Sequence, residues 1–159
     1  MKKVTRRLFG HGVLAAGIAA PALARGETSP TAEVYVAALS ELTVGQSVAF
    51  AYPEPHAAML VKLNRPAEFG VGPGQAVVAY HVACPHMGCP VVTLDAQKLA
   101  AGQFGPCVCH GSLFDLTAHG RQIHGRASQD LVRVQLRVDG DAIYATGIVG
   151  LPFGEANRI

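Results

Sequence analysis

Cys84-Pro85-His86-Met87-Gly88-Cys89 and Cys107-Val108-Cys109-His110-Gly111-Ser112 are the two most informative stretches of this 159-residue chain. Together they hold all four of its cysteines, and each places one histidine close to a cysteine. Thiolates and imidazoles at such short spacings are ligands that proteins use for zinc and for iron. Each stretch therefore offers one half of a metal site.

The pattern Cys-x-His-x-Gly-Cys followed by Cys-x-Cys-His-Gly-Ser resembles the two motifs of Rieske iron–sulfur proteins. Their [2Fe–2S] cluster is held by two thiolates on one iron and two imidazoles on the other. By match to the motif, Cys84 and Cys107 are predicted to bind the inner iron. His86 and His110 are predicted to bind the outer iron, because these spacings let one tight loop reach both irons.

The resemblance also gives roles to the other residues of the two motifs. Cys89 and Cys109 correspond to the disulfide that joins the two cluster loops in many family members. Gly88 and Gly111 lie where the backbone must turn sharply or approach the cluster sulfides closely.

Ser112 and Phe114, which follow the second histidine, bear on the redox potential of the cluster. In high-potential Rieske proteins a Ser and a Tyr, two residues apart, donate hydrogen bonds to the cluster. Here the Ser is present as Ser112, but Phe114 occupies the Tyr position. Such bonds stabilise the more negative reduced state, so the missing hydroxyl predicts a lowered midpoint potential.

Two other interpretations of the cysteines are a zinc site and a pair of disulfides. Neither explains two histidines at these offsets in glycine-containing hexapeptides. The remaining histidines are expected to be surface or loop residues, because the four ligand positions are already filled; they are His11, His56, His81, His119 and His124.

The first residues resemble an export signal. Thr5-Arg6-Arg7-Leu8-Phe9 is similar to a twin-arginine motif, an apolar stretch follows over 13–20, and Ala22-Leu23-Ala24 offers a cleavage site. We therefore predict a leader over 1–24 and a single domain over 25–159, exported folded to the periplasm. Association with a membrane is expected only if the leader is retained.

Composition argues against nucleic-acid binding. Without the leader's four basic residues, nine basic residues remain against eleven acidic ones, a formal charge near −2. Eighteen Gly and ten Pro, with no Trp, favour short strands and turns over long helices.

The pattern along the chain predicts an all-β fold. The resemblance implies antiparallel sheets in a basal sandwich or barrel-like domain, with a cluster-binding subdomain of about residues 83–119 inserted in it. A short helical or irregular segment is expected within Asp95–Gly102. Alternating residues predict a hairpin over Val132–Val138 and Ile143–Ile148 that turns at Asp139-Gly140. The other expected strands are Val34–Ala38, Val48–Tyr52, Met59–Leu63, Gln75–Val82, Val91–Val92 and Leu113–Leu116.

A closer resemblance is to the small subunit of arsenite oxidase. It rests on the leader, the single domain, His81-Val82-Ala83 before the first motif, and the segment Gly125–Leu131 after the second. It implies a large catalytic partner, in a heterodimer or larger complex, that carries a molybdopterin cofactor and a [3Fe–4S] cluster. This chain would have no catalytic residues and would pass electrons through its single [2Fe–2S] cluster to a cytochrome c or small copper protein.

Two alternatives stay open at this stage. The Rieske subunit of a quinol–cytochrome c reductase usually keeps a membrane anchor and has a Gly-Pro-x-Pro loop, where this chain has Gly125-Arg126-Ala127-Ser128. Rieske ferredoxins and the Rieske domains of ring-hydroxylating oxygenases are cytoplasmic and normally lack the disulfide pair.

Overall fold

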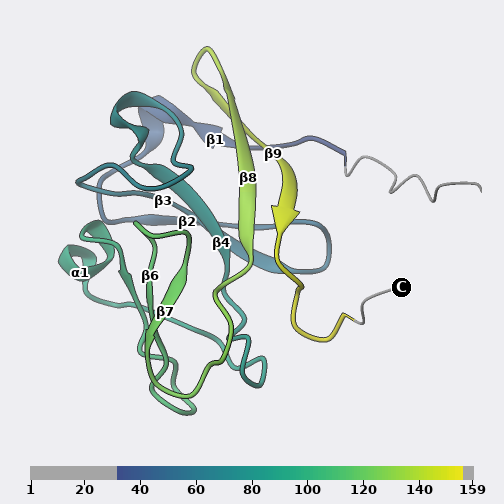
Figure 1. Ribbon diagram of the computed structural model, residues 1–159. Coiled ribbons are helices and arrows are strands. Elements are labelled where there is room, and N and C mark those ends of the chain that lie inside the picture. The colour runs from purple at the N-terminus through teal and green to yellow at the C-terminus, as the bar shows by residue number, and fades with distance from the viewer. Residues whose placement is uncertain (1–31, 156–159) are drawn as a thin grey trace, which may run out of the picture.

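The computed structural model describes residues 32–155, which form nine strands and one short α-helix (Figure 1). The strands are β1 (Val34–Ala38), β2 (Ser47–Ala51), β3 (Ala57–Lys62), β4 (Val77–His81), β5 (Gln103–Phe104), β6 (Leu113–Asp115), β7 (Arg121–His124), β8 (Arg133–Asp139) and β9 (Ala142–Val149); the helix is α1 (Ala96–Ala100), and 3-10 turns cover Leu39–Glu41 and Pro73–Gln75. The predicted all-β class is confirmed.

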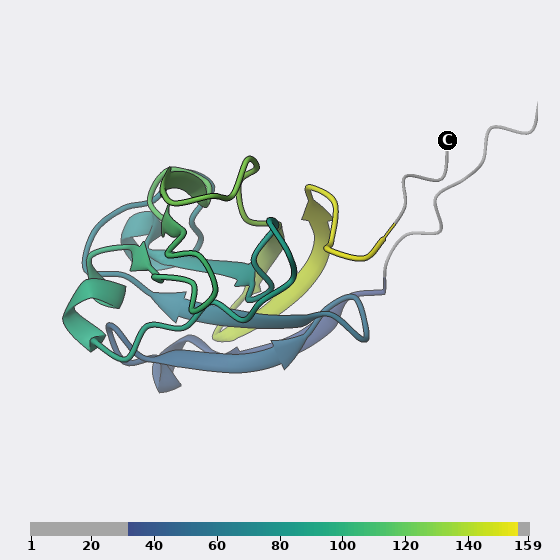
Figure 2. The same cartoon turned by 90° about the horizontal axis from the view of Figure 1, so that it is seen from below.

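The strands form two sheets, and every pairing between named strands is antiparallel. The larger sheet has the order β1-β9-β8-β4-β3-β2, and the smaller one has the order β5-β6-β7. Figures 1 and 2 show the smaller sheet, α1 and the neighbouring loops against one side of the larger sheet. The β8–β9 hairpin confirms the prediction from alternation, and its turn contains Gly140 at φ +58°.

The core explains why β3 and β4 are the most buried strands. Side chains alternate between the two faces of a strand. Met59 and Val61 belong to a cluster that also holds residues of the smaller sheet, whereas Ala58 and Leu60 pack into a second cluster with β1 and β9. The larger sheet is thus covered on both faces at its centre. The first cluster also contains Cys84 and Cys107, so the predicted metal site lies on the packed junction between the two sheets.

Some segments differ from the sequence prediction. Val91–Val92 is not a strand; Val91 is buried and Val92 is exposed. The next residue, Thr93, bonds to Gly105 through its side chain: Thr93 Oγ1 donates to the Gly105 carbonyl and accepts from the Gly105 N–H. The expected helical segment is confirmed as α1, where the Asp95 carboxylate accepts from two backbone N–H groups of the first turn. Strand β7 was not predicted, because its sequence lacks alternation and most of it is exposed.

The predicted leader and the polar segment after it lie outside the described residues. Within 32–155, no helix has the length and apolar character needed to cross a bilayer.

The prediction that His81 is a surface residue is wrong. It ends β4, is 2% exposed, and its Nε2 donates to the Tyr52 carbonyl oxygen at 2.7 Å. Its ring stacks on that of His56, with centroids 5.5 Å apart. Burial lowers the pKa of His81, although the bond to Tyr52 opposes this shift. The fold therefore favours the neutral imidazole.

This burial predicts acid sensitivity. Because the pKa of His81 is lower in the folded chain than in the unfolded chain, where it is ~6.5, the unfolded chain binds the proton first. The stability from this residue is therefore fully present above about pH 6.5 and is lost as the pH falls toward the folded value. His81→Gln keeps a donor but cannot titrate, so its unfolding free energy, measured by denaturant titration, should fall less between pH 7 and pH 5 than that of the wild type. Equal losses would contradict the assignment.

Candidate metal centre

The two predicted cluster loops have the same backbone fold. In the first, the Cys84 N–H donates to the carbonyl of Cys89 and the Gly88 N–H donates to the carbonyl of Cys84, both at 2.8 Å. In the second, the Cys107 N–H donates to the carbonyl of Ser112 at 2.7 Å and the Gly111 N–H to that of Cys107 at 2.9 Å. Each loop is thus a closed turn that begins at a cysteine and can present its side chains inward.

The glycines of these loops have the conformation that the motif predicts. Gly88 has φ +73° and Gly111 has φ +71°, values in the left-handed region that glycine adopts without steric cost. Gly88 is also confined by space, because a Cβ there would lie 2.5 Å from the ring of Phe153. Gly111 has open space around it, so the backbone angle alone accounts for glycine there.

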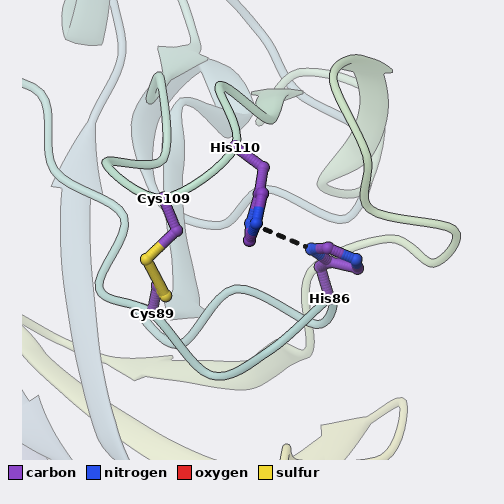
Figure 3. The surroundings of a disulfide bond; sticks show 4 residues. All are labelled: His86, Cys89, Cys109 and His110. Carbon is purple, nitrogen blue, oxygen red and sulfur yellow. Dashed lines mark hydrogen bonds between the residues drawn. A yellow bond between two sulfur atoms is a disulfide. The ribbon is translucent and has the colours of Figure 1, made fainter.

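The two loops bring His86 and His110 together at the rim of the site (Figure 3). Their Nδ1 atoms are 3.2 Å apart and their rings are nearly perpendicular, at 83°. Two imidazole nitrogens bound to one tetrahedral metal at ~2.1 Å lie about 3.4 Å apart. The Nδ1 pair therefore has the separation of two ligands on one metal, and each Nε2 is left free of that metal.

The cysteines that remain free are Cys84 and Cys107, and both are buried. The two thiols are close enough to interact. Burial is the main cause that raises the pKa of Cys84, and the Cys107 thiol adds to it; the His86 N–H and the Ser112 hydroxyl, which stabilise a thiolate, oppose it. Those donors favour the thiolate that binds a metal.

The donor set fits a two-metal group better than a single ion. Among residues 32–155, no three His, Cys, Asp or Glu side chains converge on one point that an ion would occupy. The thiols form one pair in the core and the imidazoles another at the surface. A [2Fe–2S] group, with thiolates on one iron and imidazoles on the other, matches this division, and a single tetrahedral zinc does not.

The other two cysteines form a disulfide, as the resemblance implies. Cys89 and Cys109 join the two loops on the flank of the histidine pair (Figure 3). The interpretation of the four cysteines as two disulfides is therefore wrong, because Cys84 and Cys107 stay free.

Ser112 is held in place by a segment that sequence reasoning did not connect to the site. Its fully buried Oγ accepts hydrogen bonds from the backbone N–H groups of Arg126 and Ala127, at 3.1 and 3.0 Å. A hydroxyl has two lone pairs and one proton, so its proton is left for the Cys84 sulfur. Gly125, at φ +90°, makes this approach possible, since a Cβ there would lie 2.4 Å from the Ser112 Cα.

Comparison with known proteins gives one family. A model of the Rieske [2Fe-2S] domain matches residues 32–135. The iodate reductase subunit IdrB of Denitromonas iodatirespirans is 44% identical over 126 residues, which cover 79% of this chain and 67% of that protein. Its counterpart in Pseudomonas sp. (strain SCT) is 41% identical over 121 residues, covering 75% and 62%. The chain thus matches about two thirds of the length of these relatives.

A solved structure supports the fold. The soluble domain of the Rieske protein II (soxF) from Sulfolobus acidocaldarius aligns with a TM-score of 0.63 at 23% identity, over 76% of this chain and 83% of that one. At this identity the likeness bears on the fold alone, and it confirms the Rieske-type arrangement of antiparallel sheets.

Proposed function

The chain belongs to the Rieske [2Fe–2S] family and carries such a cluster, and we propose that it is the electron-transfer subunit of a periplasmic oxyanion oxidoreductase. Cys84 and Cys107 hold the inner iron, and His86 and His110 hold the outer iron. The observation that carries the ligand assignment is the arrangement of the donors: a buried thiol pair, and an imidazole pair nearer the surface whose Nδ1 atoms are 3.2 Å apart. The role as a subunit of such an enzyme is supported by the two iodate reductase subunits, which are more than 40% identical.

The cluster accepts and releases one electron at a time. The chain's own residues set how this happens. Cys84 and Cys107 are buried, so water is kept from the inner iron. The Ser112 hydroxyl donates toward the sulfur of Cys84. The outer edges of the His86 and His110 imidazoles are the route by which an electron enters or leaves. No bond of the substrate is broken on this chain.

The substrate is bound by a large partner subunit, which we propose carries molybdopterin and a [3Fe–4S] cluster. Arsenite is the first candidate substrate, on the resemblance stated above, and a cytochrome c or small copper protein is then the electron acceptor. Iodate is the second candidate, because two relatives more than 40% identical are iodate reductase subunits. The direction of electron flow differs: arsenite supplies electrons to this chain, whereas iodate takes them from it.

Purification of the native complex tests the proposal. A large molybdenum-containing subunit should copurify, and the complex should either reduce cytochrome c with arsenite or oxidise a reduced dye with iodate. Copurification of a cytochrome b instead would identify a quinol–cytochrome c reductase.

The periplasmic location is part of this proposal. It is supported by the Arg6-Arg7 motif and by the Cys89–Cys109 disulfide, since disulfides persist in oxidising compartments. Replacing both arginines of the motif by lysine should leave the holoprotein in the cytoplasmic fraction, whereas unchanged export would contradict the assigned pathway.

Phe114 gives a prediction about the midpoint potential. It is fully buried in the same core cluster as Cys84 and Cys107 and has no hydroxyl to donate. Phe114→Tyr should raise the potential by roughly 40 mV, if the added hydrogen bond is worth ~1 kcal/mol to the reduced state. Phe104→Tyr is the matched control, because Phe104 is buried opposite Phe114 in the β5–β6 pair and should leave the potential unchanged. Redox titration followed by visible absorption gives both values, and a lowered or unchanged potential in Phe114→Tyr would refute the assignment.

A further inference from the structure

A pocket of about 550 Å³ lies outside the predicted cluster site. It is formed by the loop before β4, the turn after β6, the segment that leads into β8 and the end of β9. None of the four predicted cluster ligands lines it. Its residues are Glu68, Phe69, His119, Gln129, Asp130, Leu131, Arg133, Val149, Gly150 and Leu151.

Arg133 is the unusual residue of this pocket. Its guanidinium lies over the ring of Phe69, with 4.3 Å between Cζ and the ring centroid, and its buried Nε has no hydrogen-bond partner. Among the described residues no carboxylate pairs with it. Arg137, on the same strand, also lies over an aromatic ring, that of Tyr144, but it is paired with Glu33 at 2.6 Å and with Asp139. The residue as a whole is only half-buried, so an acceptor supplied from outside would reach the guanidinium through its other nitrogens and offset the cost of a charged group without an acceptor.

The rim of the pocket is held in an unfavourable backbone conformation. Phe69 has φ +60° and His119 has φ +46°, in the left-handed region that side chains other than glycine rarely adopt. The Phe69 side chain is 65% exposed, so burial in the core does not explain why this residue keeps a strained backbone angle. His119 is fixed by Glu68 at 2.7 Å and Asp130 at 3.5 Å. Strained residues of this kind gather at binding sites, where function keeps them.

An apolar strip connects the pocket to the first cluster loop. Val149, Leu151 and Phe153 alternate along the chain, and each is close to half exposed. The Phe153 ring lies against Gly88, next to the solvent-exposed Met87. The distance along the chain from Val149 to Phe153 is at most about 14 Å. The pocket and the cluster loop are thus parts of one surface.

We propose that this surface is the docking site for the catalytic subunit, which inserts an apolar side chain into the pocket and pairs an adjacent carboxylate with Arg133. The proposal rests on the function proposed above. A protein partner fits because the apolar strip continues well beyond the pocket. A carboxylate fits because Arg133 makes no ion pair within residues 32–155, while the pocket's own carboxylates, Glu68 and Asp130, contact His119 instead. Docking here sets the partner against the loop that carries His86.

Binding of the large subunit, separated from the native complex, to the holoprotein tests this assignment. Arg133→Met keeps the length of the side chain and removes its charge, and it should raise the dissociation constant at least about tenfold, since truncating one member of a buried charge pair usually costs that much or more. Arg137→Met is the matched control and should bind as the wild type does. Wild-type affinity in Arg133→Met would overturn the proposal.

Phe69→Gly separates docking from folding. Glycine adopts φ +60° without strain, which offsets the added entropy of the unfolded chain and the lost contact with Arg133, so the isolated holoprotein should unfold close to the wild-type temperature, yet its affinity for the large subunit should fall. A fall in thermal stability with unchanged affinity would assign Phe69 a purely structural role and refute the proposal. If the wild-type chain itself fails to bind a large subunit, the proposed function fails rather than the pocket.

A photoreactive phenylalanine analogue at position 69 identifies the occupant. It should cross-link to a segment of the large subunit that contains an acidic residue beside an apolar one. Cross-linking to a second copy of this chain, or protection by a small molecule that copurifies, would overturn the assignment.

Discussion

Replacing Cys84 with serine is expected to abolish the [2Fe–2S] cluster. Cys84 is 1% exposed and its sulfur interacts with Cys107, so the site has no other thiol that could take its place without breaking the disulfide. An alcohol rarely loses its proton near neutral pH and is a poor ligand for iron in a sulfur-rich group. Iron and acid-labile sulfide should fall to background, and the visible absorption of the cluster should disappear.

Histidine variants extend this test to the outer iron. His86→Ser and His110→Ser should each lose the cluster as well, because both imidazoles are needed on that iron. His119→Ser is the control: it removes a histidine that pairs with Glu68 in the pocket beside Arg133 and is no predicted ligand, so the variant should retain full iron content. Retention of the cluster in any of the three ligand variants would show that the assigned ligand set is wrong.

Much of the site could be predicted because its information is local. The two loops close on themselves through bonds between a cysteine and residues four or five positions later, so a hexapeptide fixes most of each loop. The left-handed glycines, Gly88 and Gly111, belong to the same short segments. The β8–β9 hairpin was equally readable, since alternation and a glycine turn lie side by side in the chain.

What could not be predicted depends on contacts between distant residues. His81 is buried because β4 is covered on both faces, which only the assembled sheets reveal. The contact of Gly125 with Ser112 joins residues thirteen positions apart through a bulged strand pair. Val91–Val92 has the composition of a strand, but its pairing is limited to the Ala83–Pro90 bridge and the bond from the Val91 N–H to the Val82 carbonyl, and beyond it Thr93 bonds to Gly105 through its side chain. Local preference is overridden where tertiary contacts satisfy the backbone in another way.

Removal of the Cys89–Cys109 disulfide should lower the stability of the fold strongly while sparing the ligands. The bridge links cysteines twenty positions apart, and no backbone hydrogen bond within the described residues joins 84–89 to 107–112. Between the loops, the chain therefore relies on side-chain contacts, the cluster and this bond. In the chain-entropy model a closed loop of this length lowers the entropy of the unfolded chain enough to stabilise the fold by ~3 kcal/mol.

The double variant Cys89→Ser/Cys109→Ser should therefore lose ~3 kcal/mol of unfolding free energy and melt roughly 10 °C lower, while still binding iron. In the folded protein the cluster and the disulfide both join the same two loops. The unfolded chain does not hold the cluster, so only the disulfide cross-links it. The disulfide therefore keeps its full effect on the entropy of the unfolded chain. Reduction of the wild type before unfolding should reproduce the loss, and reduction of the double variant should change nothing. Denaturant titrations with and without reductant measure all four values. Equal stability of variant and wild type would mean that the loops are held by the cluster and by core packing around Cys84 and Cys107, with the disulfide adding nothing to the fold.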